Sequence, residues 1–228
     1  MGNQQVDPRW PRLLSLAVHE FRTPITVVAG YLRMVLKERA GAISDQQRRL
    51  LEEAEKSCGR LSGLVAEMSD LSALEAGKAA FNRAPLDLSA LLKEQIAGLP
   101  ELPDRSVSVV LEGADAPVQM TGDATRLRLA FTSLLTALRR EVVASDRLVA
   151  RLRPGSSGSL CVIAIGDSSA VDTIAQSDLS SLEPFDEWRG GSGLSLAIAR
   201  RVFGQHGGSL FGPPDGEKAG AILLLPRQ

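Results

Sequence analysis

The side chains best suited to chemistry lie near the N-terminus, in the run HEFRTP at residues 19–24. In a helix, His19 and Thr23 are one turn apart on the same face. An imidazole is a competent phosphoryl or acyl nucleophile near neutral pH. The adjacent carboxylate of Glu20 could orient the ring or take its proton. Pro24 lacks an N–H, so a local kink is expected there. The alternative is that this histidine is structural.

Two long helices are predicted to position this run, after a polar, flexible N-terminus at residues 1–8. Apolar residues recur at alternating spacings of three and four from residue 9 to about residue 40. Ser44 and Gln47 match a capping box that opens a second helix, which ends near Ala76-Gly77 with the glycine as C-cap. The two seams comprise Leu14, Ala17, Phe21, Pro24, Val28, Tyr31 and Val35, and then Leu51, Ala54, Cys58, Leu61, Val65 and Met68.

The apolar stripes on these helices are too broad for a single hairpin to bury. Pairing two copies of residues 9–76 would give a homodimeric four-helix bundle with twofold symmetry. The alternative is an intramolecular helical pair that lies on the second domain. The width of both stripes favours the dimer.

The run at residues 19–24, inside a long amphipathic helix, resembles the phospho-acceptor box of the sensor histidine kinases of two-component systems. The resemblance implies that His19 exchanges a phosphoryl group with an aspartate in the receiver domain of a response regulator. It also implies that Glu20 and Thr23 serve a phosphatase activity, since the family uses the acidic residue after the histidine and the polar residue three further on.

The bulk composition narrows the function classes. The length of 228 residues predicts one or two domains, and the net charge of -1 gives no reason to expect nucleic acid or an acidic membrane as partner. Cys58 and Cys161 lie in apolar runs and read as buried thiols, which fits a reducing cytoplasm. No apolar run is long enough to cross a bilayer. No metal-ligand cluster is predicted.

A second domain is predicted at residues 87–228, after a linker at residues 77–86 that is marked by Gly, Asn and Pro. Helices and strands alternate along it, and residues 166–192 read as loop. The pattern predicts an α/β sandwich, so the fold class of the whole chain is α+β. The predicted elements are helices at 87–99, 123–140 and 194–205, and strands at 106–112, 118–121, 147–153, 160–165, 209–211 and 221–225.

Two features of this domain point to a nucleotide. A glycine-rich turn that includes Gly191 and Gly193 runs directly into an apolar helix at Leu194. Such a turn lets backbone N–H groups approach phosphates. Its position, after a Pro-Phe pair and before a His-Gly-Gly run, is similar to the ATP-binding domain of histidine kinases. The resemblance implies that Asp167 accepts the adenine amino group, whereas His206 is expected only to contact carbonyls at a helix end.

Three departures from the family pattern concern the same nucleotide. The helix that should carry a Mg²⁺-binding asparagine reads FTSLLTALRR at residues 131–140 and contains none. The first glycine box keeps Asp167 but has Ser169 and Val171 in place of its glycines, and Ser195 replaces another. Because phosphoryl transfer from ATP depends on positioning and on Mg²⁺, ATP with Mg²⁺ is expected to bind weakly or not at all.

The sequence therefore predicts a cytoplasmic, homodimeric phosphotransfer protein of histidine-kinase type, with doubtful autokinase activity. One alternative is a pseudokinase, a dimeric scaffold that binds a regulator without binding nucleotide. Another is a helical hairpin fused to an unrelated α/β domain.

Overall fold

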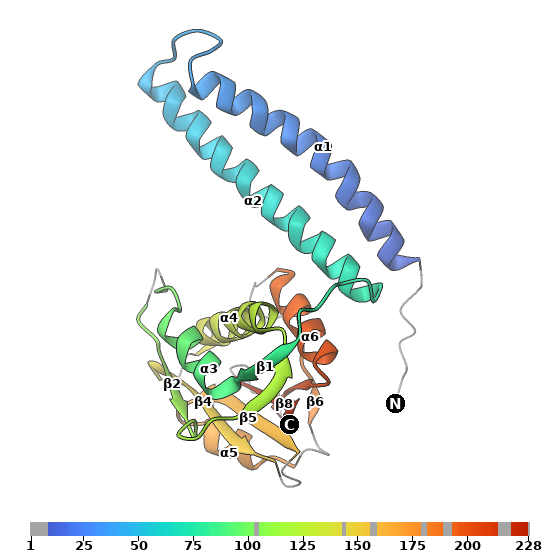
Figure 1. The fold of residues 1–228 in the computed structure, drawn as a ribbon. Helices are drawn as coiled ribbons and strands as arrows, with labels where there is room; N and C mark the ends of the chain where they lie inside the picture. Colours follow the sequence, from blue (N-terminus) through green and yellow to red (C-terminus); the bar gives the residue numbers. More distant parts are fainter. Residues whose placement is uncertain are drawn as a thin grey trace. The chain divides into compact units, whose positions relative to one another are not determined.

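The computed structural model describes residues 9–102, 105–142, 145–155, 159–178, 182–188, 193–213 and 220–227. The chain divides into two compact units, Met1–Ala79 and Ala80–Gln228. The first is a helical hairpin and the second combines a mixed sheet with helices (Figure 1). The predicted α+β class is confirmed. No helix among the described residues is long and apolar enough to cross a membrane.

The first helix, α1 (Trp10–Leu36), continues through Pro24 and ends four residues before the predicted limit. Glu38 adopts a left-handed φ of 55°, which a helix cannot accommodate. The guanidinium of Arg48 holds this turn, since it donates to the Leu36 carbonyl at 3.1 Å and pairs with Glu38 at 2.5 Å. The sequence prediction overextended the helix because these polar residues have good helix propensity, whereas the turn depends on a contact from the next helix.

The second helix, α2 (Asp45–Glu75), begins and ends as predicted. Its capping box is complete: the Gln47 N–H donates to the Ser44 hydroxyl at 3.2 Å, and the Ser44 N–H donates to the Gln47 side chain at 2.8 Å. At the other end Gly77 adopts a φ of 64°, the left-handed conformation that terminates many helices.

The two helices pack along a narrower line than the predicted seam. The Ser72 hydroxyl donates to the Pro11 carbonyl at 2.9 Å, and the Cys58 thiol lies 3.5 Å from the Ile25 carbonyl. This antiparallel register buries Leu14 and Val18 against α2. The other apolar side chains of the hairpin stay exposed, among them Leu13, Leu16, Phe21, Val27, Val28, Tyr31, Met34, Leu50, Leu61 and Leu64.

Part of the predicted seam is therefore left uncovered in a single chain. Phe21, Val28 and Tyr31 were expected at its centre, but they point away from α2. The apolar stripe of α1 is wide enough to face more than one neighbour, and the spacing alone does not say which side meets which helix. One chain thus leaves a second apolar stripe uncovered.

The second unit contains a six-stranded sheet in the order β2-β4-β5-β8-β7-β6. Strands β2 and β4 are parallel, and the other neighbours are antiparallel. The strands are β2 (Ser108–Glu112), β4 (Arg147–Pro154), β5 (Leu160–Asp167), β6 (Glu183–Pro184), β7 (Ser209–Gly212) and β8 (Gly220–Pro226). A separate antiparallel pair joins β1 (Ala84–Asp87) to β3 (Gln119–Gly122). Strand β1 thus begins inside the stretch that was expected to be linker.

Helices α3 (Leu88–Ala97), α4 (Ala124–Glu141) and α6 (Ser195–Gln205) cover one face of this sheet (Figure 1). Asp87 and Asp123 cap the N-termini of α3 and α4 with their carboxylates. The rings of Phe131 and Phe203 meet edge to face at 5.0 Å between α4 and α6. These fully buried rings form part of the main core.

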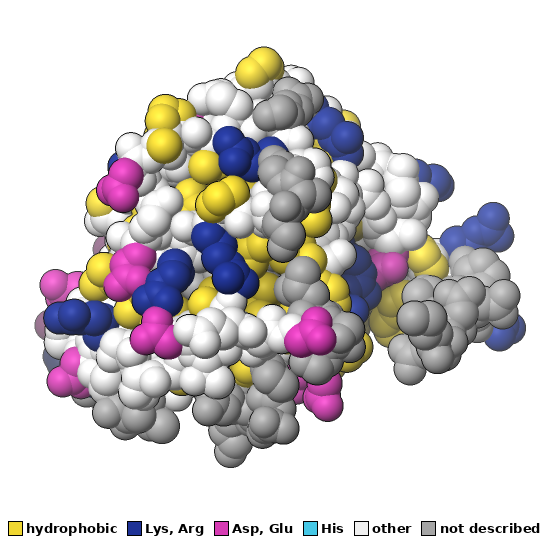
Figure 2. Space-filling view, turned by 90° about the horizontal axis from the view of Figure 1, so that it is seen from below, with side chains coloured by type: hydrophobic (Ala, Val, Ile, Leu, Met, Phe, Trp, Pro, Cys, Tyr) yellow, Lys and Arg dark blue, Asp and Glu magenta, His cyan; other side chains and the backbone are white. Residues whose placement is uncertain are grey.

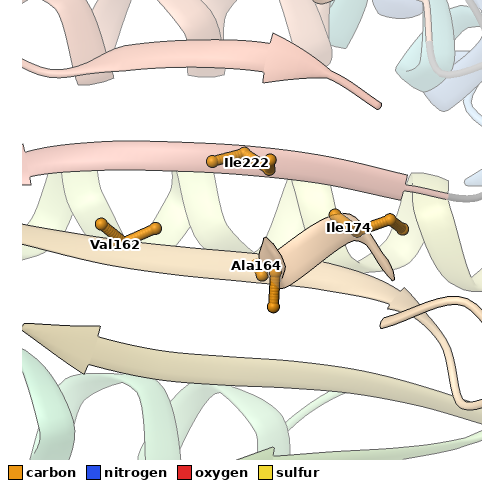
Figure 3. Packing of buried hydrophobic residues seen from close by; sticks show 5 residues of the cluster. Val162, Ala164, Ile174 and Ile222 are labelled. Carbon is orange, nitrogen blue, oxygen red and sulfur yellow. The ribbon is translucent and has the colours of Figure 1, made fainter. Parts of the chain in front are cut away.

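The opposite face carries α5 (Val171–Gln176), a helix inside the stretch that the sequence analysis assigned to loop. Val162 and Ala164 of β5 and Ile222 of β8 pack against Ile174 and Ala175 of α5 (Figure 3). Three apolar residues at helical spacing are too few to predict a helix, and burial on the sheet stabilises this one.

Charged side chains border this second core. Arg151 of β4 pairs with Glu112 of β2 at 2.7 Å and with Asp172 of α5 at 2.5 Å. Seen from below, Lys and Arg side chains lie among hydrophobic ones (Figure 2).

The cysteine of the second unit, Cys161, is buried, and burial raises the pKa of its thiol to about 11. Both cysteines are free and buried, as predicted.

Candidate functional site

The imidazole of His19 is an exposed group on α1. Its side chain is 79% exposed and that of Glu20 is 72% exposed, with His19 Nδ1 3.6 Å from Glu20 Oε1. A carboxylate at this position favours a proton on Nδ1, which leaves the Nε2 lone pair directed to solvent. The pair therefore presents an accessible nitrogen nucleophile.

Helix geometry explains why this histidine is accessible. Val18 is buried against α2, and the next residue is turned about 100° around the helix, away from that contact. Thr23 lies one turn further along and is also exposed. The structure thus brings the three predicted residues together on the outer surface of α1. Exposed Leu16 and Phe21 flank them.

Asp167 lies at the end of β5 and is only 4% exposed. The N–H and hydroxyl of Ser169 lie 2.9 and 2.7 Å from Oδ1. The N–H and hydroxyl of Ser145 lie 3.0 and 2.8 Å from Oδ2. Each carboxylate oxygen thus accepts a hydrogen bond from a backbone N–H of the protein itself.

The electrostatics of Asp167 follow from this arrangement. Burial alone would raise the pKa of the carboxyl group, but the hydrogen bonds from Ser169 and Ser145 outweigh burial and lower it. Asp167 is therefore a stable, internally bonded anion.

The glycine turn is described only in part. Gly191 and its neighbours at 190 and 192 lie outside the described residues. Gly193 has a φ of 58° with open space around its α-carbon, and Leu194 is the N-cap of α6 without a side-chain cap hydrogen bond. The described part thus keeps the glycine-then-helix geometry that the sequence predicted.

The helix that should carry a Mg²⁺ ligand does not offer one. On α4, the Thr132 hydroxyl donates to the Gln95 side chain of α3 at 3.0 Å. Thr136 is half-buried and Ala137 is fully buried. A methyl group cannot ligate Mg²⁺, and a threonine hydroxyl is a weaker ligand than an amide or carboxylate oxygen. α4 therefore lacks the asparagine that the family resemblance implies as the Mg²⁺ ligand.

His206 has a second contact that the sequence did not reveal. As predicted, it caps α6, with Nδ1 2.7 Å from the Val202 carbonyl. Its Nε2 also accepts a hydrogen bond from the Asp123 N–H at 2.9 Å, across 83 residues of sequence. Burial lowers the pKa of the ring, which fits a neutral imidazole protonated on Nδ1.

Comparison with known proteins gives one family match and many relatives. Residues 11–77 match the His Kinase A (phospho-acceptor) domain. The chain is 28% identical over 222 residues to the sensor protein GacS of Pseudomonas syringae pv. syringae, covering 92% of this chain and 24% of that protein. It is 26% identical over 206 residues to the signal transduction histidine-protein kinase BarA of Escherichia coli K12, covering 84% and 22%. The chain thus spans about a quarter of these relatives.

Solved structures agree at the level of fold. Full-length ShkA in complex with AMPPNP superposes with a TM-score of 0.67 at 20% identity, covering 95% of this chain and 46% of that one. The histidine kinase AdeS of Acinetobacter baumannii gives a TM-score of 0.57 at 19% identity, covering 92% and 97%. Both combine the hairpin with the sheet unit. These matches show that residues 11–77 form a His Kinase A (phospho-acceptor) domain, and that the chain is similar to sensor histidine kinases over most of its length.

Proposed function

We propose that this chain transfers phosphoryl groups between His19 and an aspartate of a response-regulator receiver domain. The observation that carries this proposal is the exposed imidazole with its Glu20 partner inside the phospho-acceptor domain. In the step from regulator to hairpin, Nε2 attacks the phosphorus of the aspartyl phosphate. An N–P bond forms, the P–O bond breaks, and the electron pair leaves on the aspartate carboxylate. Glu20 stabilises the cationic ring that results.

The functional form is a homodimer. The side chains that α1 and α2 leave uncovered include Val28, Tyr31 and Leu61, which form an apolar stripe beyond the intramolecular contact. Two hairpins can bury these stripes against each other in a four-helix bundle. Burial of apolar surface at about 25 cal/mol per Å² would make the association stable.

Autophosphorylation from ATP is slow or absent in this proposal. ShkA has been solved with AMPPNP, so a related fold can hold an ATP analogue. In this chain, Asp167 is occupied by donors from Ser145 and Ser169. No asparagine lies on α4. ATP with Mg²⁺ should therefore bind weakly at most.

Thr23 and Glu20 support a further step, the dephosphorylation of the regulator. Both are exposed beside His19 on the same helix. A hydroxyl and a carboxylate at this distance can orient a water molecule for attack on an aspartyl phosphate. The reaction would need the hairpin and the regulator, but no nucleotide.

A second candidate is favoured by the state of Asp167. If the second unit binds no nucleotide, the chain could act as a pseudokinase whose dimeric hairpin only docks a regulator. In that case the regulator would bind without exchanging its phosphoryl group. This outcome separates the two candidates.

The decisive experiment uses a panel of ³²P-labelled phospho-receiver domains with wild-type chain, His19→Ala and the control Arg33→Ala. Arg33 is exposed on the same helix and bonds only its own turn. We expect label on wild type and Arg33→Ala and none on His19→Ala. Receiver binding without label on wild type would support the scaffold, and label on His19→Ala would show that another residue is the acceptor.

A further inference from the structure

The residues after α2 are fastened to that helix up to the last residue of the first unit. The N–H groups of Lys78 and Ala79 both donate to the Ala73 carbonyl, at 2.9 and 3.1 Å, and that of Gly77 donates to Leu74 at 3.1 Å. The chain therefore has little freedom before Ala80, although its composition predicted a linker over residues 77–86.

The next four residues, 80–83, are bound to the rest of the second unit by hydrogen bonds that begin at the Ala80 carbonyl. The Ala80 carbonyl accepts from Arg126 Nε at 3.2 Å, and the Asn82 N–H donates to Asp123 Oδ2 at 2.9 Å. Arg83 Nη2 donates to the Gln205 carbonyl at 2.5 Å. Successive residues thus reach the N-terminus of α4 and the C-terminus of α6.

Phe81 lies at the centre of these contacts. The guanidinium carbons of Arg126 and Arg83 lie 4.9 and 5.7 Å from its ring centroid. The His206 ring meets it edge to face at 5.5 Å, with an interplanar angle of 77°. Cation–π and aromatic contacts of this kind are attractive, so the ring anchors the segment between two helix ends.

His206 joins the two helix ends that hold this segment. It caps α6 through Val202 and accepts from the Asp123 N–H, the N-cap residue of α4. A Cβ on Gly122 would lie 2.9 Å from its Cδ2, so the ring packs directly on the end of β3. Every polar atom of the ring has a partner, and none is left for substrate.

We propose that residues 80–83 form a strap, latched by His206, that confines motion between the two units to the Ala79–Ala80 junction. Opening the strap frees four more residues, which extends the reach of the connection by about 13 Å. The strap therefore sets how far the second unit can travel from the hairpin. The inference concerns the mechanics of the connection and does not depend on phosphotransfer.

Hydrogen exchange of the Asn82 amide tests the strap directly. We expect slow exchange in the wild type. Phe81→Ala, which removes both cation–π contacts, should speed it about tenfold. The control is Arg128→Gln, on the same helix as Arg126. It removes an ion pair with Glu94 of α3 and should leave Asn82 exchange unchanged. Cleavage by trypsin after Arg83 should rise with Phe81→Ala as well.

Fast exchange of the Asn82 amide in the wild type would contradict the proposed strap. Equal Asn82 exchange rates in Phe81→Ala and Arg128→Gln would contradict it as well. The amides of Ile163 and Ile165 in β5 report unfolding of the whole unit. If these amides also exchange faster in Phe81→Ala, the test is repeated with Phe81→Leu. Leucine keeps the apolar bulk of the side chain but has no aromatic face. Asn82 exchange as slow in Phe81→Leu as in wild type would then contradict the proposal.

Discussion

The candidate reactive groups of the two units differ in their exposure and in their hydrogen bonding. On the hairpin, His19 and Glu20 are exposed and contact mainly each other. In the second unit, Asp167 is buried and bonded on both oxygens by its own chain. A buried polar group whose hydrogen bonds are all made within the protein contributes to stability. An exposed group with an unused lone pair can bind a ligand or react. From this contrast we propose that the phosphotransfer chemistry lies on the hairpin and that Asp167 stabilises the second unit.

The largest effect should come from His19→Ala. Removal of the nucleophile should reduce phosphoryl uptake from a phospho-receiver at least about a thousandfold, whereas Asp167→Asn should change it less than about twofold. Phosphoryl uptake is measured by gel autoradiography of the hairpin-containing chain. Equal losses in both variants would contradict the proposed difference between the two units, because they would make Asp167 part of the reaction.

The next effect concerns dimerisation. Val28→Asp places a charge in the exposed stripe of both hairpins, and the loss of about 1.5–3 kcal/mol per copy should weaken the dimer at least about a hundredfold. Leu129→Asp is the matched control, since Leu129 is also exposed but lies on α4. Sedimentation velocity should show a shift to monomer only for Val28→Asp. A wild-type monomer at micromolar concentration would contradict the dimer itself.

Restoring a metal ligand should test whether the second unit has lost nucleotide binding. An asparagine at Thr136 or Ala137, together with Ser169→Gly to remove one of the two donors to Oδ1 of Asp167, should raise Mg²⁺-dependent ATP affinity about tenfold. Calorimetric titration with and without Mg²⁺ measures the change, with Ser169→Gly alone as the control. Micromolar binding of Mg²⁺–ATP by the unmodified chain would contradict the proposed weakness.

Acid should destabilise the second unit through His206. The folded pKa lies below the usual 6.5 because of burial, with Arg83 and Arg126 adding to the effect and Asp123 opposing it. The unfolded chain therefore binds more protons, so the free energy of unfolding falls as pH drops below about 6.5 and levels off below the folded pKa. In His19→Gln, His206 is the single histidine, and its NMR titration should move the Asp123 amide signal. If the Asp123 amide signal does not shift as His206 titrates, His206 is not the latch of the strap.

The smallest effect should be that of Thr23→Ala. A water-orienting hydroxyl contributes modestly, so dephosphorylation of a cognate phospho-regulator should slow about tenfold while transfer to His19 stays within about twofold. Phosphate release and protein labelling measured in parallel separate the two reactions. Parallel loss of both would point to damage of α1 near Pro24 and would weaken the case for a specific role.

Local sequence was sufficient for the features that depend on neighbouring residues. The capping box of Ser44 and Gln47 and the glycine that ends α2 both lie where the sequence predicted. The same holds for the one-turn spacing of His19 and Thr23. Such features rest on hydrogen bonds and dihedral preferences within a few residues, and these are written in the order of the side chains.

Contacts between distant residues could be found only in the tertiary structure. The sequence showed a broad apolar stripe on α1. It did not show that Val18 is buried against α2 while Phe21 stays exposed. It showed Asp167 but not that Ser145, 22 residues earlier, occupies one of its oxygens. It assigned residues 77–86 to a linker, whereas Asn82 is bonded to Asp123 across 41 residues. Composition and spacing carry no information about which distant groups meet, because packing of the whole chain selects those partners.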